Sequence, residues 1–146
     1  MNLYSNQLTG TIPESLRFRK LVHADFGRNQ FSGTLPDDFG LRSVSLRFLY
    51  MDHNEFTGTI PYSYTTVGNG RVEALAFNHN QLTGWVPGYY QHYKLLELNL
   101  HNNTFTGVDW ETCRQGVFDT GEMVEFTADC DVCICDPYCG KCKNKW

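Results

Sequence analysis

The feature that most constrains this chain is a short motif that recurs along its first 107 residues. The five copies read NQLTGTIP, NQFSGTLP, NEFTGTIP, NQLTGWVP and NTFTGVDW. Their first residues, spaced 23 to 26 apart, are Asn6, Asn29, Asn54, Asn80 and Asn103. A period of this length is typical of stacked repeat architectures, in which each unit buries its apolar face only against its neighbours.

Three apolar residues precede each asparagine, with a spacing of three and then two. The complete sets are Leu21/Ala24/Phe26, Leu46/Leu49/Met51, Val72/Leu75/Phe77 and Leu95/Leu98/Leu100, and Met1 and Leu3 form an incomplete first set. Residues two apart point to the same side of a β-strand, so each unit predicts a short strand with one apolar side. The residues after each asparagine, such as 8–12, alternate in polarity and predict a second short strand.

The recurring asparagine is predicted to be a buried bend residue. Its amide would bond the backbone of the neighbouring unit and satisfy polar groups that the core leaves without partners. Repeated five times, these side chains would form an asparagine ladder: Asn6, Asn29, Asn54, Asn80 and Asn103. The PESL and PDDF segments at 13–16 and 36–39 predict single helical turns that begin at proline.

These motifs resemble the plant-type leucine-rich repeat, LxxLxLxxNxLxGxIPxxL, over residues 1–107. The resemblance implies an α/β repeat solenoid: a curved array with a parallel concave sheet and short convex turns. Two units are longer than the others, so we expect residues 62–70 (YSYTTVGNG) to form a convex loop. The fifth motif has Trp110 where the others have proline, which marks the end of the regular array.

Residues 108–146 differ in composition and are predicted to be a final coil with a cysteine-rich C-terminal cap. Met123, Phe126 and Ala128 repeat the apolar spacing and predict one more strand, with Phe126 in line with Leu98. The six cysteines are Cys113, Cys130, Cys133, Cys135, Cys139 and Cys142. The open end of a solenoid exposes apolar core, so a cap is expected there.

Two interpretations of the cysteines stay open. Disulfides suit an extracellular repeat protein, although the sequence does not determine their pairing. Both CxxC pairs, 130–133 and 139–142, have the spacing of zinc ligands. Only five residues separate the pairs and Cys135 interrupts them, so the spacing favours three disulfides and no metal site.

Outward residues of neighbouring strands would form rows about 4.8 Å apart across the concave face. Aromatic side chains with polar neighbours are typical of protein and peptide recognition. The predicted ligand-binding residues are Phe48, Tyr50, Asp52, His53, Asn78, His79 and His101. The alternative is an ordinary solvated sheet face. Without a third ligand, His53 and His79 are interpreted as surface residues rather than as a metal site or a pH switch.

Several functions are disfavoured by the sequence. The net charge of −4 argues against a nucleic-acid-binding protein with a basic face, and no apolar run is long enough to span a membrane. The sequence has no GxSxG, HExxH, P-loop or GxGxxG motif, so neither an enzyme nor a cofactor is predicted. Asn102 begins the only N-x-[ST] sequon and is a predicted glycosylation site if the protein is secreted.

The resemblance implies a non-catalytic recognition module that binds a protein, peptide or glycan on its concave face. It would belong to a secreted or receptor-like protein located outside the cell or at its surface. Met1 lies inside a repeat, so we expect any signal peptide or anchor in sequence missing from this chain. The cysteine tail is more similar to repeat proteins of diatoms and related algae than to land-plant caps.

Two alternatives remain at this stage. An intracellular scaffold would bind zinc through its cysteine tail. An ice- or surface-binding solenoid would use stacked hydroxyls at Thr9/Thr11, Ser32/Thr34 and Thr57/Thr59, a row that Trp85 and Val108 interrupt.

Overall fold

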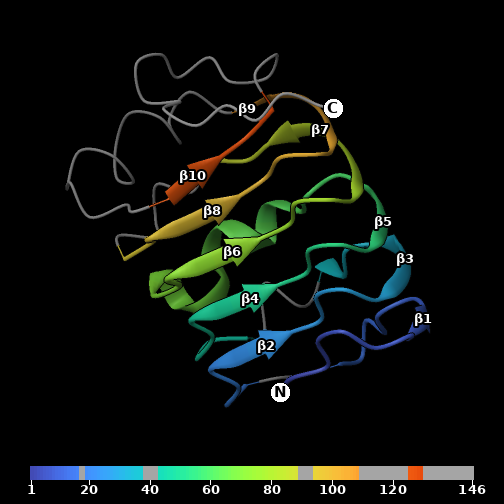
Figure 1. Ribbon diagram of the computed structural model, residues 1–146. Helices are drawn as coiled ribbons and strands as arrows, with labels where there is room; N and C mark the ends of the chain where they lie inside the picture. Colours follow the sequence, from blue (N-terminus) through green and yellow to red (C-terminus); the bar gives the residue numbers. More distant parts are fainter. Residues whose placement is uncertain (17–18, 38–42, 89–93, 109–124, 130–146) are drawn as a thin grey trace.

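The computed structural model describes residues 1–16, 19–37, 43–88, 94–108 and 125–129, which form a solenoid with two parallel sheets (Figure 1). The described strands alternate between the two sheets along the chain. The first sheet contains β2 (His23–Asp25), β4 (Phe48–Tyr50), β6 (Ala74–Ala76), β8 (Glu97–Asn99) and β10 (Glu125–Thr127). The second contains β1 (Thr9–Gly10), β3 (Gln30–Thr34), β5 (Glu55–Gly58), β7 (Gln81–Val86) and β9 (Thr104–Val108).

The first sheet follows the predicted apolar spacing. Its strands pair in the order β10-β8-β6-β4-β2, and Figure 1 shows them stacked across the molecule. The central strand residues are in register, and Phe126 pairs with Leu98 as the sequence predicts. Because side chains alternate along a strand, the central residues of β2, β4, β6 and β8 point inward and their neighbours point to the outer side, which we call the concave face.

The core lies between the two sheets. Leu49, Leu75 and Leu98 from the first sheet are fully buried, and so are Phe56 and Leu82 from the second. Burying one such side chain contributes about 1.5–3 kcal/mol, so stacking the units is the main source of stability.

The second sheet presents hydroxyl side chains to solvent. Thr34 and Thr57 are exposed and in register between β3 and β5. Trp85, which is 62% exposed, interrupts this pattern on β7. In each motif, glycine follows the first hydroxyl residue because a larger residue would be strained there. Gly33, for example, has a φ of +78°, and a Cβ at this position would lie 2.8 Å from Cγ2 of Thr11.

The asparagine side chains bond the backbone between units. Asn54 donates through Nδ2 to the carbonyl oxygens of Phe26, Met51 and Asp52, at 3.1, 3.3 and 3.0 Å. Its Oδ1 accepts the N–H of Phe31 at 3.0 Å. Asn29, Asn80 and Asn103 make equivalent bonds to their own unit and the preceding one. Asn6 is exposed, and its Nδ2 bonds only the carbonyls of Leu3 and Tyr4.

Residues 62–70 are not the loop that the sequence predicts. They form η1 (Tyr62–Gly70), 3-10 turns interrupted by non-helical backbone at Val67, Gly68 and Asn69. Tyr64 and Val67 are fully buried, and the Tyr64 hydroxyl donates to the carbonyl of Pro36 at 3.2 Å. Residues three apart lie on one side of a 3-10 turn, so this pair directs the segment into the core.

The other predictions for the return segments and the tail are only partly covered by the described residues. Residues 13–16 form a turn that is closed by the N–H of Leu16 bonding the carbonyl of Pro13 at 3.0 Å. In PDDF only Pro36 and Asp37 are described. All of the cysteines lie outside the described residues. Within the described part, no helical segment has the length and apolar character that crossing a bilayer requires.

Candidate functional site

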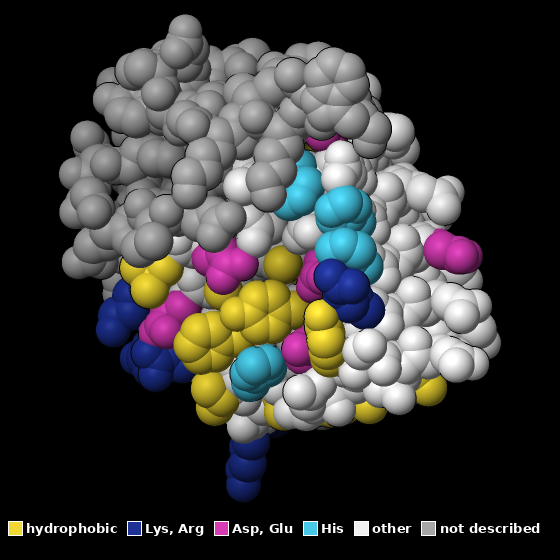
Figure 2. Space-filling model, in the orientation of Figure 1, with side chains coloured by type: hydrophobic (Ala, Val, Ile, Leu, Met, Phe, Trp, Pro, Cys, Tyr) yellow, Lys and Arg dark blue, Asp and Glu magenta, His cyan; other side chains and the backbone are white. Residues whose placement is uncertain are grey.

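A cluster of aromatic rings lies on the concave face at strands β2 and β4. The rings of Phe48 and Tyr50 are half-buried and point outward, on either side of the buried Leu49. The His23 ring from β2 lies 5.7 Å from the ring of Phe48 and 5.5 Å from that of Tyr50, between centroids. We call these three residues the aromatic patch. Figure 2 shows hydrophobic side chains gathered on this face, with acidic and histidine side chains around them.

Three carboxylates surround the aromatic patch. Asp25 Oδ1 accepts the N–H of Gly27 at 3.0 Å, and Glu97 Oε1 accepts from Asn99 Nδ2 at 2.6 Å. Asp52 Oδ2 lies 2.9 Å from Nδ1 of His53. Burial raises the pKa of the Tyr50 hydroxyl above its ordinary value, and the negative charges of Glu97, Asp25 and Asp52 raise it further. The patch therefore combines exposed aromatic surface with a negative potential.

A row of histidines lies beside the patch, in the turns that follow β4, β6 and β8. The rings of His53 and His79 are stacked, with 4.0 Å between centroids and 20° between planes. The ring of His101 meets His79 edge-on at 5.1 Å, and its Nδ1 lies 2.7 Å from Thr127 Oγ1. His53 and His79 have φ values of 51° and 55°, in the left-handed region. Among the described residues, no group of three or more metal-ligating side chains is arranged to hold a metal ion.

The structure brings together five of the seven predicted ligand-binding residues as accessible surface. Phe48, Tyr50, Asp52, His53 and His79 are all partly exposed on this face. Asn78 and His101 are only 8% and 6% exposed, so they offer a ligand little contact area. A row position predicts the direction of a side chain, but not whether neighbouring side chains cover it.

Three residues of this surface were not selected from the sequence. His23, Asp25 and Glu97 occupy the same outward rows as Phe48 and Tyr50. The repeat spacing already predicts that His23 lies beside Phe48 and Asp25 beside Tyr50, and the register confirms both pairs, so the signal for these residues was present in the sequence.

The predicted glycosylation site lies at one end of the histidine row. Asn102 Nδ2 is 3.1 Å from both ring nitrogens of His79, and the Asn102 side chain is partly exposed. A glycan on this nitrogen would therefore stand next to the histidine row.

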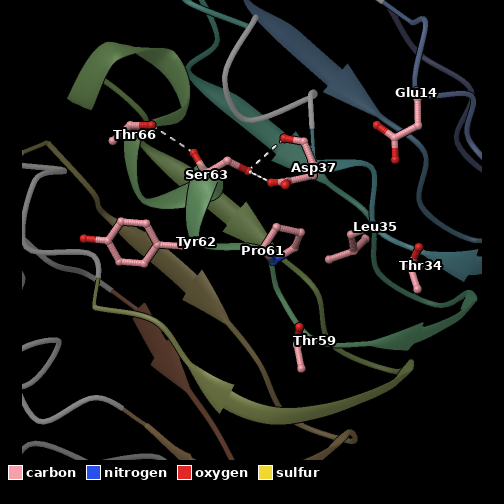
Figure 3. A pocket seen from close by; sticks show the side chains of 9 residues that line it. All are labelled: Glu14, Thr34, Leu35, Asp37, Thr59, Pro61, Tyr62, Ser63 and Thr66. Carbon is pink, nitrogen blue, oxygen red and sulfur yellow. Dashed lines mark hydrogen bonds between the residues drawn. The ribbon is translucent and has the colours of Figure 1, made fainter.

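A hollow in the protein surface lies away from the first sheet, near the start of η1 (Figure 3). Its volume is about 690 Å³, and its lining includes Glu14, Thr59 and the exposed ring of Tyr62. Ser63 Oγ donates to Asp37 Oδ1 at 2.7 Å, and Thr66 Oγ1 donates to the Ser63 carbonyl at 3.0 Å. These two hydroxyls are used inside the protein, so the concave face is the better candidate for ligand recognition.

Comparison with known proteins agrees with this geometry. The family model described as Leucine Rich Repeat matches residues 1–18, 45–66 and 94–115. Receptor-like protein 39 of Arabidopsis thaliana is 34% identical over 108 residues, which cover 72% of this chain and 12% of that protein. The chain therefore spans a small part of the length of this relative.

Solved structures of plant receptor kinases also align with this chain. A crystal structure of the Arabidopsis receptor kinase HAESA, in complex with the peptide hormone IDA and the co-receptor SERK1, aligns with a TM-score of 0.68 and 27% identity. That alignment covers 73% of this chain and 18% of the HAESA chain. The structure of a Pollen Receptor Kinase 3 aligns with a TM-score of 0.73 and 25% identity, over 90% of this chain and 62% of that one.

Proposed function

The chain belongs to the plant-type leucine-rich repeat family, and on that premise we propose that its concave face binds a peptide segment of a partner protein. The role is recognition without catalysis. The observation that carries the proposal is the partly exposed aromatic patch of His23, Phe48 and Tyr50 within a ring of carboxylates. Exposed aromatic side chains at the centre of a polar rim are the usual energetic centre of protein interfaces.

The relatives support a peptide ligand over a glycan. HAESA was crystallised with a peptide hormone, and it shares the fold and 27% of the aligned residues with this chain. We further propose that the full protein works outside the cell or at its surface, in line with the receptor-like relatives.

The test is a selection of linear peptides from a display library against the whole chain, followed by affinity measurements on the variants Tyr50→Ala and Phe48→Ala. We expect each variant to weaken binding of the selected peptides at least tenfold, because truncating a central aromatic residue at an interface costs about 2 kcal/mol or more and about 1.4 kcal/mol is a factor of ten.

The matched control is Trp85→Ala, which removes an exposed aromatic side chain from the second sheet. It should leave the affinity unchanged. If peptides lose affinity with Trp85→Ala and keep it with both patch variants, the binding surface is the second sheet and the proposal is wrong. A parallel screen of plant cell-wall oligosaccharides tests the glycan alternative, which gains support if sugars bind and peptides do not.

A further inference from the structure

We propose that the concave face recognises an arginine side chain of its ligand, with the guanidinium lying over the aromatic patch and pairing with Asp25 and Asp52. The inference rests on the proposed function and specifies which side chain the same surface reads. It makes the partner a peptide segment with arginine at its centre.

The aromatic rings provide the first part of the argument. Phe48 and Tyr50 come from one strand and are partly exposed, and His23 lies within 5.7 Å of both rings. A purely apolar ligand would need only the aromatic rings and no carboxylates beside them. Aromatic faces also attract cations, and arginine is the commoner partner because its planar, weakly hydrated guanidinium stacks on a ring.

The charges around the rings provide the second part. Asp25, Asp52 and Glu97 all act on the Tyr50 hydroxyl, so their negative potentials overlap at the patch. The nearby Arg47 is paired with Glu73, so that ion pair adds no net charge. Arg28 lies in the turn after β2, and His53 Nδ1 contacts Asp52 Oδ2. The charge of this one guanidinium is smaller than that of the three carboxylates, so the patch stays acidic.

The carboxylates also keep capacity for a ligand. Asp25 uses Oδ1 for the N–H of Gly27, and Asp52 uses Oδ2 for His53. A carboxylate has about four acceptor positions on its two oxygens, so one internal bond each holds these side chains in place without saturating them. A guanidinium has a fixed fork of donors that fits such oxygens, whereas an ammonium bonds as a point charge.

The experiment is an NMR titration of the isotope-labelled whole chain with N-acetyl-arginine N-methylamide. The neutral control is the citrulline analogue, which has nearly the same shape, and the lysine analogue tests charge alone. We expect the arginine probe to shift the backbone amides of β2 and β4, with an affinity about tenfold above that of citrulline and clearly above that of lysine. The affinity should fall as salt is added.

Variants assign the effect to the patch. Asp25→Asn keeps an oxygen that can accept from Gly27, so it removes charge while preserving the local bond, and it should weaken arginine binding about fivefold. Glu55→Gln is the matched control, since it removes one exposed carboxylate from β5 on the second sheet and should change nothing.

The outcomes separate this inference from the proposed function. Equal affinity for arginine and citrulline, or weakening by Glu55→Gln as strong as that by Asp25→Asn, would overturn the arginine assignment. Selected peptides that lack arginine and still lose affinity with Tyr50→Ala would also overturn it, while leaving the peptide-binding function in place. Peptides insensitive to the patch variants would overturn the function itself.

Discussion

Single asparagine side chains connect the repeats, and Asn54 is the clearest case. Its side chain bonds the backbone at four positions in two consecutive units: Phe26 and Phe31 in the preceding unit, and Met51 and Asp52 in its own. Asn54→Ala should therefore lower the free energy of unfolding by more than about 1 kcal/mol, because buried backbone groups lose their partners. Chemical denaturation of the two proteins measures this difference.

Asn6 is the matched control for that prediction. It begins the same motif, but it is exposed, and within the described residues its side chain bonds two carbonyls of its own unit and no backbone group of a neighbouring one. Asn6→Ala should cost less than Asn54→Ala, because water can replace the lost bonds. Equal costs, or an unchanged stability of Asn54→Ala, would contradict the role of the asparagine ladder.

The hydroxyl of Tyr50 reports the charge of the candidate site. Its pKa is raised above 10.0 in the folded protein by burial and by Glu97, Asp25 and Asp52. The raised pKa means that the neutral Tyr50 contributes to the free energy of unfolding below pH 10.0. This contribution is lost as the pH rises through the pKa of the folded protein, because Tyr50 ionises at a lower pH in the unfolded chain. A phenolate absorbance titration, with Tyr50→Phe to assign the signal, should show this late ionisation. Glu97→Gln should lower the pKa, and an unchanged titration would mean that its charge does not reach the ring.

At the level of the elements, the sequence predicts the strands better than the segments between them. The spacing of apolar residues determines which side chains reach the core, so both sheets and the register of Phe126 with Leu98 follow from it. Residues 62–70 lie in one of the two longer units, and that extra length predicts a loop. Tyr64 follows Pro61 at the spacing at which Leu16 follows Pro13, and this is the signal in the sequence for the turn that docks into the core. Exposure at the site was likewise unpredictable for Asn78 and His101, since it depends on neighbouring side chains.

The element η1 provides a prediction of its own. Tyr64 is fully buried and packs edge-on against Phe77, with 5.9 Å between ring centroids. Tyr64→Ala should lower the free energy of unfolding by about 3–5 kcal/mol, because it leaves a large cavity in the core. Tyr62→Ala on the same element removes a side chain that is 65% exposed and should have a much smaller effect. Similar thermal shifts for both variants would show that η1 does not dock through Tyr64.

At the level of the whole molecule, the repeat array continues into β10, and an acidic side chain takes part in the hydrogen bonding of the last described unit. In the earlier units the N–H groups of Asn54 and Asn80 bond backbone carbonyls of the next unit. In the last described unit, the carboxylate of Asp129 accepts from the N–H groups of Asn102 and Asn103, at 2.9 and 3.2 Å. Asp129, which directly precedes Cys130, thus replaces a backbone carbonyl of the earlier units.

The state of those cysteines separates the extracellular proposal from the intracellular zinc scaffold. An extracellular protein that caps its core with disulfides should have no free thiols after denaturation. Its intact mass should rise by about six daltons on reduction, two for each of three disulfides. Mass spectrometry of protein from its native source, with thiol alkylation before and after reduction, measures this. Free thiols together with bound zinc would instead place the cysteines in a reducing compartment, and the cell-surface assignment would be wrong.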